Sequence, residues 1–177
     1  MTVKIENIEL DKENMLDVLA SFPEQIKKGV DLAANTAVKK EEIDKILVSG
    51  MGGSALAGEI LKSYLDIDIP IIICRNYMLP KNITERTLLF SCSHSGNTEE
   101  TVEALREATK KKCKVITMSS GGKLEEYAKT FKLKHIKLPK GMQPRNAYGY
   151  MFFIMLKVLE NSSIVPDQTQ DIELTYK

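Results

Sequence analysis

The sequence repeats one local pattern twice: a short apolar run, a turn of small and hydroxylated residues, and then a helical pattern. In the first copy the apolar run 46–48 is followed by the turn 49–54, Ser-Gly-Met-Gly-Gly-Ser. In the second copy the run 88–90 is followed by the turn 91–98, Ser-Cys-Ser-His-Ser-Gly-Asn-Thr. Where a strand passes into a helix, free backbone N–H groups and the positive end of the helix dipole favour an anion. Each turn is therefore predicted to bind an oxyanion of phosphate size.

Strand and helix patterns alternate along most of the chain. Strands are predicted at residues 45–48, 70–74, 87–92, 114–118 and 133–138, and helices at 54–65, 97–112, 123–130 and 145–160. Unbroken apolar runs such as 71–73 indicate strands buried on both faces, which favours a parallel sheet covered by helices. Right-handed crossovers then predict a three-layer α/β sandwich of about five strands. Its ligand cleft is expected at the carboxyl ends of the strands, near a topological switch point.

The two ends of the chain carry further helical patterns. Residues 11–38 are helical except at 21–24, where Ser21 is a candidate cap and Pro23 suits a first helical turn, so two helices are predicted. Residues 161–166 have the composition of a linker, and 167–174 are typical of the capped start of another helix. We expect residues 1–40 to form an N-terminal helical arm, 41–162 the main domain, and 163–177 the passage to a second domain.

Composition excludes several classes of partner. A chain of 177 residues, 43% hydrophobic and 28% charged, fits one soluble domain of ordinary size. Its formal net charge of +1 gives no support for a nucleic acid or membrane partner, and no apolar run approaches the roughly 20 residues that span a bilayer. Three cysteines, an odd number without metal-ligand spacing, favour a reduced, cytoplasmic protein that holds no metal.

The first turn is ambiguous when taken alone. Gly50, Gly52 and Ala55 meet the loose dinucleotide fingerprint, with Arg75 available for a 2′-phosphate, but a glycine turn without any ligand is also compatible. The second turn favours a phosphomonoester, because its serine and threonine hydroxyls can converge on one tetrahedral anion. No lysine follows either glycine turn, which counts against a nucleoside triphosphate.

The turns resemble those of the sugar isomerase (SIS) domain, in which a serine-rich turn binds the phosphate of a phosphosugar. Residues 93–98 match that family's Ser-x-Ser-Gly-x-Thr signature. The segments 50–54, 119–124 (Ser-Ser-Gly-Gly-Lys-Leu) and 143–145 (Gln-Pro-Arg) follow the order and spacing of bifunctional phosphoglucose/phosphomannose isomerases. The resemblance runs from about Lys45 to Glu160. It implies an SIS-like, flavodoxin-type αβα sandwich with a central, mainly parallel five-stranded sheet.

The resemblance also implies roles for particular residues. One group would hold the sugar phosphate, namely Ser54, Ser93, Ser95 and Thr98, while Gly52 and Gly53 would let the backbone approach the sugar. Arg145 would face the C1–C2 region and stabilise an enediolate, for which a fixed cation is well suited. The alternative for Arg145 is a surface residue at a helix start. His94 stands where the family usually has tyrosine, and it is interpreted as a packing residue; the alternative is that a protonated His94 donates a hydrogen bond to the phosphate. His135, inside an apolar strand, is interpreted as structural.

The implied reaction is the interconversion of fructose 6-phosphate with glucose 6-phosphate and mannose 6-phosphate through a cis-enediol, without metal or organic cofactor. Isomerisation needs a base and a ring-opening acid. In the resembling family these come from a second SIS domain, and the glutamates that follow the two turns, Glu59, Glu99, Glu100 and Glu103, all fall on predicted helices. We therefore expect this chain to bind the phosphosugar without efficient turnover.

Two alternative functions and one assembly question stay open. The chain could be a stand-alone module that senses phosphosugars, or a single-domain isomerase whose base comes from a neighbouring subunit. A homodimer is expected, because SIS domains usually associate. The segment 148–155 is too apolar on all sides for a surface helix. Burial of this helix within one chain explains the same pattern equally well.

Overall fold

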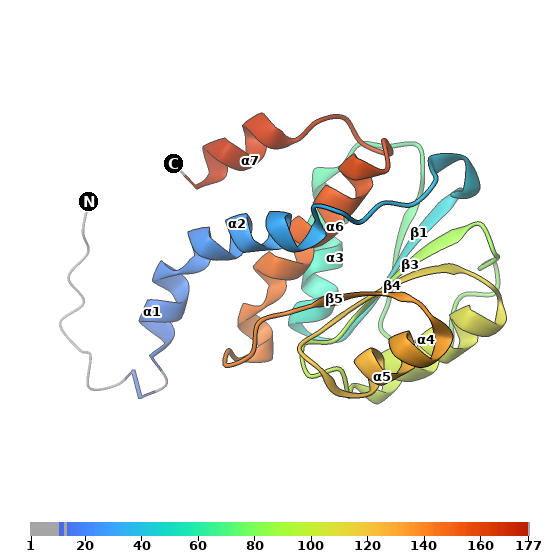
Figure 1. Ribbon diagram of the computed structural model, residues 1–177, viewed down its shortest axis with the longest axis horizontal. Helices are drawn as coiled ribbons and strands as arrows, with labels where there is room; N and C mark the ends of the chain where they lie inside the picture. The colour runs from blue at the N-terminus through green and yellow to red at the C-terminus, as the bar shows by residue number, and fades with distance from the viewer. Residues whose placement is uncertain (1–10, 13, 177) are drawn as a thin grey trace.

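The protein is described here by a computed structural model covering residues 11–12 and 14–176. These residues form one five-stranded sheet with the order β2-β1-β3-β4-β5, in which every neighbouring pair is parallel (Figure 1). The strands are β1 (Lys45–Ser49), β2 (Ile71–Cys74), β3 (Thr87–Cys92), β4 (Lys114–Ser119) and β5 (Lys134–Lys137). The predicted α/β class, strand number and parallel direction are confirmed.

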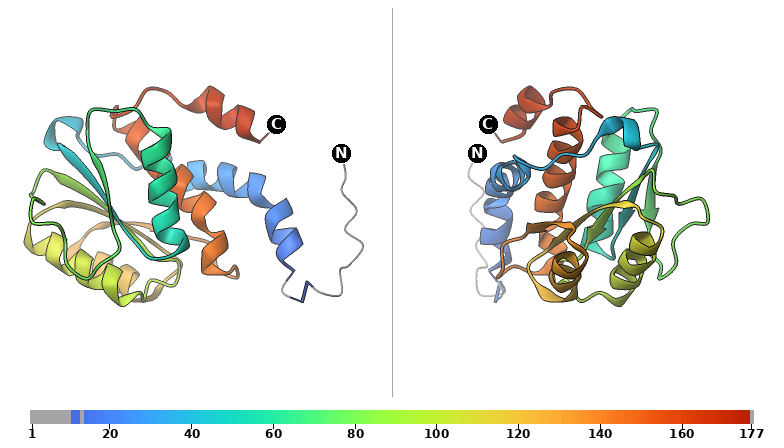
Figure 2. Two further views of the ribbon diagram at one scale, coloured as in Figure 1. Left: turned by 180° about the vertical axis from the view of Figure 1, so that it is seen from behind. Right: turned by 45° about the vertical axis from the view of Figure 1, so that its right-hand side comes forward.

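Helices cover both faces of the sheet, so the fold has three layers (Figure 1, Figure 2). Alternate residues of the central strands point to opposite faces: Ile46 and Val48 belong to one apolar cluster, and Leu47 between them belongs to the other. The first face is covered by α2 (Phe22–Ala33), α3 (Gly53–Tyr64) and α6 (Tyr148–Asn161), and the second by α4 (Glu99–Lys110) and α5 (Gly122–Phe131). Burial on both faces explains why the strands read as unbroken apolar runs.

The apolar helix α6 is buried within this one chain. It packs between α2 and α3 on the sheet, and residues around its whole circumference, such as Tyr150, Met151, Phe153 and Ile154, are buried. Of the two explanations that its sequence allowed, burial in the monomer is therefore sufficient. A helix that is apolar on every side is expected in such a position.

The N-terminal helices are confirmed as two, α1 (Met15–Ala20) and α2, with Pro23 in the first turn of α2. The predicted side-chain cap at Ser21 is wrong. Ser21 Oγ donates to the Val18 carbonyl at 2.9 Å, and among the described residues it makes no capping bond to α2. The side chain that caps a helix here is Asp11, whose two carboxylate oxygens accept the N–H groups of Met15 and Leu16.

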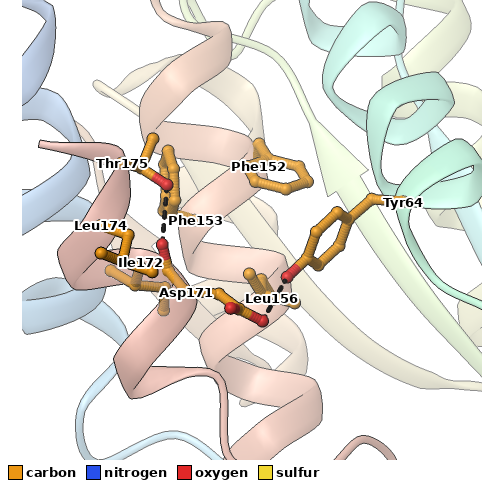
Figure 3. Close-up of a pocket in the computed structure, with 8 residues that line it drawn as sticks. All are labelled: Tyr64, Phe152, Phe153, Leu156, Asp171, Ile172, Leu174 and Thr175. Atoms are coloured by element: carbon orange, nitrogen blue, oxygen red, sulfur yellow. Dashed lines mark hydrogen bonds between the residues drawn. The ribbon is translucent and has the colours of Figure 1, made fainter.

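The C-terminal segment packs against the domain. Ile164 and Val165, in the part with linker-like composition, are buried, and the further helix forms as α7 (Thr169–Thr175). The Tyr64 hydroxyl donates to Gln168 Oε1, just before α7, at 2.8 Å. It also faces the Asp171 carboxylate of α7 at 3.4 Å (Figure 3), so Tyr64 fastens α7 to the end of α3. Burial and the Asp171 charge both raise the pKa of Tyr64. An apolar groove of about 470 Å³ lies between α3, α6 and α7.

Two short 3₁₀ turns complete the described fold, η2 (Lys40–Glu42) and η3 (Pro144–Asn146). No helix within the described residues is long and apolar enough to cross a lipid bilayer.

His135 lies in the edge strand β5 in a position that suits a neutral imidazole. Its Nδ1 is 2.8 Å from Thr117 Oγ1, and its Nε2 is buried with no hydrogen-bond partner among the described residues. Burial lowers the pKa of His135 below its ordinary value, although the Glu125 carboxylate opposes this effect. These contacts support the structural interpretation of this histidine.

We predict that His135 makes the stability depend on pH. Because its folded pKa is depressed, the unfolded chain binds a proton first as the pH falls below about 6.5. The contribution of His135 to the free energy of unfolding is therefore complete above that pH, and it is lost as the pH falls through the folded pKa. Urea midpoints measured between pH 7.5 and 5.5 should decline more steeply for the wild type than for His135→Asn. Parallel profiles for the two proteins would contradict this prediction.

Candidate functional site

The two glycine–serine turns lie side by side at the carboxyl edge of the sheet. Strands β1 and β3 are direct neighbours, with Ser49 in register with Ser91, while β2 pairs with the other side of β1. The switch point of the sheet is therefore between β1 and β3, which is where ligands bind in folds of this strand order. The two turns also touch, because a Cβ added to Gly50 would lie 3.0 Å from the Cys92 carbonyl oxygen.

Three hydroxyl groups of the second turn come together at the start of α4. Ser93 Oγ lies 2.8 Å from Thr98 Oγ1 and 3.4 Å from Ser95 Oγ. Ser93 is buried, Thr98 half-buried and Ser95 exposed, so the group extends from the protein interior to solvent. Thr98 is the residue before α4, yet among the described residues its side chain makes no capping bond to that helix. We call Ser93, Ser95 and Thr98 the hydroxyl cluster; it lies at the positive end of the α4 dipole, where an anion is favoured.

The first turn places Ser54 and a bare backbone segment beside this cluster. Ser54 lies in the first turn of α3 and is buried; its Cβ and the Cys92 carbonyl flank the same point next to Gly50. Gly52 has φ 52° and ψ −124°, a conformation open essentially to glycine. A Cβ at Gly52 would meet no atom of the described residues within 4 Å, apart from its chain neighbours. The backbone here faces open space.

Arg145 reaches the same edge from another part of the chain, and its predicted local structure is wrong. The predicted helix 145–160 begins only at Tyr148, and Arg145 lies before it in the 3₁₀ turn η3. This turn packs on the start of α3, since a Cβ added to Gly53 would lie 3.0 Å from Arg145 Cα. Arg145 is exposed and has no ion-pair partner among the described residues, whereas Arg75 pairs with Glu59 at 3.0 Å. Within the described part of the chain, Arg145 is thus an unpaired cation at the carboxyl edge of the sheet.

The turn after β4 forms a third wall that the sequence reasoning did not assign. Its Ser120 donates to the His94 carbonyl oxygen through both the backbone N–H and the hydroxyl, each at 2.8 Å. Lys123 N–H donates to Asn97 Oδ1 at 3.0 Å, which ties the start of α5 to the second turn. The signal in the sequence was the glycine pair 121–122, which permits this close approach.

His94 belongs to the same framework. The ring of His94 is buried, with Nε2 3.1 Å from the Pro139 carbonyl oxygen, so it links the second turn to the segment after β5. Because a carbonyl oxygen can only accept, Nε2 carries the hydrogen and donates this bond. The ring is therefore already engaged with the protein. This geometry favours the packing interpretation of His94.

The carboxylates that follow the turns are directed to other partners. Glu59 pairs with Arg75, Glu103 pairs with Arg106, and Glu99 accepts a long hydrogen bond from the Tyr77 hydroxyl at 3.5 Å. Glu100 lies near the same hydroxyl, because its charge is the largest cause that raises the pKa of Tyr77, followed by burial and Glu99. Within the described residues no group of three or more His, Cys, Asp or Glu side chains is arranged to hold a metal ion. The site can bind an anion and present a cation.

Comparison with known proteins identifies the type of domain. The chain is 38% identical over 167 residues to the bifunctional phosphoglucose/phosphomannose isomerase of Caldicellulosiruptor bescii, covering 92% of this chain and 49% of that protein. The C-terminal domain of glucosamine-fructose-6-phosphate aminotransferase from Francisella tularensis has the same fold, with a TM-score of 0.70, 15% identity and coverage of 98% of this chain and 56% of that one. The chain is homologous to bifunctional phosphoglucose/phosphomannose isomerases and has the fold of phosphosugar isomerase SIS domains.

Two further findings define the limits of this relationship. The chain spans about half the length of the curated relatives it matches, between 39% and 51%. Its fold also matches the Vibrio vulnificus NanR protein complexed with ManNAc-6P, with a TM-score of 0.59, 16% identity and coverage of 92% of this chain and 69% of that one. No protein-family model matches the chain. The resemblance read from the motifs is confirmed.

We predict that Gly53→Ala displaces η3 while the domain stays folded. Alanine suits a helix start better than glycine, but its Cβ would press on Arg145 Cα at 3.0 Å and on the Arg145 and Pro144 carbonyl oxygens at 3.2 Å. These are backbone atoms, so η3 has to move by a few tenths of an ångström. In ¹H–¹⁵N spectra the Arg145 and Asn146 amide signals should shift, whereas those of residues 93–97 should not. Unchanged Arg145 and Asn146 signals would show that the two segments are not in contact.

Proposed function

We propose that this SIS domain binds the substrate of an aldose–ketose isomerase that interconverts fructose 6-phosphate with glucose 6-phosphate and mannose 6-phosphate through a cis-enediol. The observation that carries the proposal is the hydroxyl cluster at the positive end of α4, beside the turn that follows β1. The named isomerase relative, which aligns with 92% of the chain, supports the choice of substrate. The reaction as proposed uses neither a metal nor an organic cofactor.

In this proposal the phosphate is held by neutral groups. Ser54, Ser93, Ser95 and Thr98 donate hydroxyl hydrogen bonds to it, and backbone N–H groups at the start of α4 add the helix dipole. Gly52 and Gly53 let the backbone of the first turn approach the sugar. Short hydrogen bonds to a charged phosphate are worth about 1.5–3 kcal/mol each, so a few of them suffice for specific binding.

In this proposal Arg145 stabilises the negative charge that develops during proton transfer. When a proton leaves the carbon next to the carbonyl, negative charge develops on the C1–C2 oxygens, and a cation already in place stabilises that charge without reorganisation. Arginine suits this role because its guanidinium stays protonated and presents several donors in a fixed plane. Its packing on Gly53, next to the proposed sugar contact, supports the assignment.

The base and the ring-opening acid are proposed to lie outside this chain. The carboxylates near the turns pair with Arg75, Arg106 and Tyr77, and the chain spans about half of its relatives. We propose that residues 41–162 are the phosphosugar-binding domain, that residues 1–40 are an arm on it, and that 163–177 lead to a second domain. The intact protein is proposed to be a cytoplasmic homodimer.

One alternative has an observation in its favour. The NanR protein complexed with ManNAc-6P has this fold and holds a phosphosugar. In this alternative the chain senses a phosphosugar without converting it. A single-domain isomerase with a base from a neighbouring subunit is the other alternative. The phosphosugar remains the ligand in all three cases. Turnover by the pure chain would single out the last of them, the single-domain isomerase.

We predict that Ser95→Ala combined with Thr98→Ala abolishes fructose 6-phosphate binding and leaves the fold intact. Loss of two hydrogen bonds to the phosphate, at about 1.5–3 kcal/mol each, corresponds to roughly two to four orders of magnitude in Kd. Isothermal titration calorimetry measures the effect, and circular dichroism checks the fold. Ser63→Ala with Thr130→Ala, two exposed hydroxyl positions on α3 and α5, is the matched control. Equal affinity of both double variants would remove the phosphate assignment.

We predict that the pure protein binds fructose 6-phosphate but does not isomerise it. The physical reason is that, in this proposal, the described residues supply the anion site and the cation but not a positioned base. A coupled assay for glucose 6-phosphate, run at saturating substrate, should give the rate of the blank. Robust conversion would mean that the base is present after all, and gel filtration would then show whether a neighbouring subunit supplies it.

A further inference from the structure

We propose that Asn97 is a positioning residue for the phosphosugar site: its side chain locks the second turn to the start of α5 and thereby fixes the hydroxyl of Ser95. The inference rests on the proposed function, since it concerns the same site. It adds a residue to which the signature of the turn gives no role, because Asn97 stands at its variable position.

Asn97 forms hydrogen bonds both to the turn after β4 and within its own turn, the second one. Its Oδ1 accepts the N–H of Lys123 at 3.0 Å, and its own backbone N–H donates to Ser95 Oγ at 3.2 Å. Helix α5 begins at Gly122, so the Lys123 N–H is one of the first groups of that helix that lack a partner within it. The residue before α5 is Gly121, which has no side chain for capping. Asn97 therefore caps α5 from the neighbouring turn.

The surrounding contacts make this a rigid junction. Leu124 N–H donates to the Gly96 carbonyl at 3.0 Å, next to the Asn97 bond. Gly96 has φ 75°, and a Cβ on it would overlap the Gly121 carbonyl oxygen. Gly122 has φ 69°, and a Cβ there would lie 2.6 Å from both Asn97 Oδ1 and the Ser95 carbonyl oxygen. The second turn and the turn after β4 therefore approach each other as closely as glycine allows.

The consequence for the ligand follows from what Ser95 does. Ser95 is the exposed member of the hydroxyl cluster, so packing restrains its side chain less than that of buried Ser93. Its oxygen accepts the Asn97 N–H, which fixes the oxygen and leaves the hydroxyl hydrogen free to donate to an anion. Without the hydrogen bond from Lys123 to the Asn97 side chain, the backbone of residues 95–97 becomes more mobile. Anion binding then has to order this segment, which costs free energy and lowers the affinity.

The experiment removes this bond from each side. Asn97→Ala removes the acceptor, and Lys123→Pro removes the donor N–H, which lies in the first turn of α5 and has no partner within the helix. Lys123→Ala is the matched control, because it deletes the same ammonium group but keeps the N–H. Fructose 6-phosphate affinity is measured by calorimetry, and the melting temperature and the exchange rate of the Lys123 amide are measured without ligand.

We expect Asn97→Ala to weaken fructose 6-phosphate binding about tenfold relative to wild type, and Lys123→Pro to weaken it about tenfold relative to Lys123→Ala. The double variant Asn97→Ala/Lys123→Pro should lose no more than either change alone, and the Lys123 amide should exchange faster in Asn97→Ala. Should Lys123→Pro fail to fold, Asn97→Ala and the amide exchange still decide.

Three results would overturn the inference: unchanged affinity in Asn97→Ala, equal affinity of Lys123→Pro and Lys123→Ala, or additive losses in the double variant. The last two would mean that Asn97 acts on the ligand by another route than this bond. Absence of fructose 6-phosphate binding in the wild type is a separate outcome, which removes the proposed function itself.

Discussion

The whole arrangement depends on one constraint: the strands are parallel and buried on both faces. Helices occupy both sides of such a sheet, so polar turns are confined to its edges, and parallel strands bring all their carboxyl ends to the same edge. Because β1 and β3 are neighbours, two turns that are distant in sequence meet there. The third turn, after β4, joins them, and η3 reaches them through its contact with Gly53. The site is thus a product of topology before any side chain is considered.

Two carboxylates share the positive end of α4 with the proposed anion, so the positions of the hydroxyl groups matter more there. The positive end of α4 favours an anion, but Glu99 and Glu100 already lie in the first turn of that helix and use the same field. A bound phosphate therefore depends on directional hydrogen bonds more than on bulk positive charge, and the hydroxyl cluster has to be held in place for them. Contacts such as the Asn97–Lys123 bond and the Gly96–Gly121 approach perform this holding role.

The features that depend on local sequence pattern, the strands and the turns after them, were predicted correctly. The features that depend on tertiary contacts were missed. Unbroken apolar runs such as 71–73 predicted buried parallel strands, and the glycine–serine turns predicted where they end, because both follow from short-range rules. Arg145 was placed at a helix start, yet packing against Gly53 holds it in a 3₁₀ turn. Ser21 has the composition of a cap, but its hydroxyl bonds backward to Val18. The role of Asn97 was invisible because its partner, Lys123, belongs to another turn.

Binding and proton transfer make different demands on such a domain, and this chain meets the first more fully. Holding a phosphate requires hydroxyls, backbone N–H groups and a dipole, all of which local turns at one sheet edge supply. Moving a proton between C1 and C2 requires a base within reach of those carbons. The carboxylates beside the turns are engaged with Arg75, Arg106 and Tyr77, so recruiting one would break an existing contact. In the proposed function the anion site and the base therefore belong to different parts of the protein, so the same anion site can serve with different catalytic or regulatory partners.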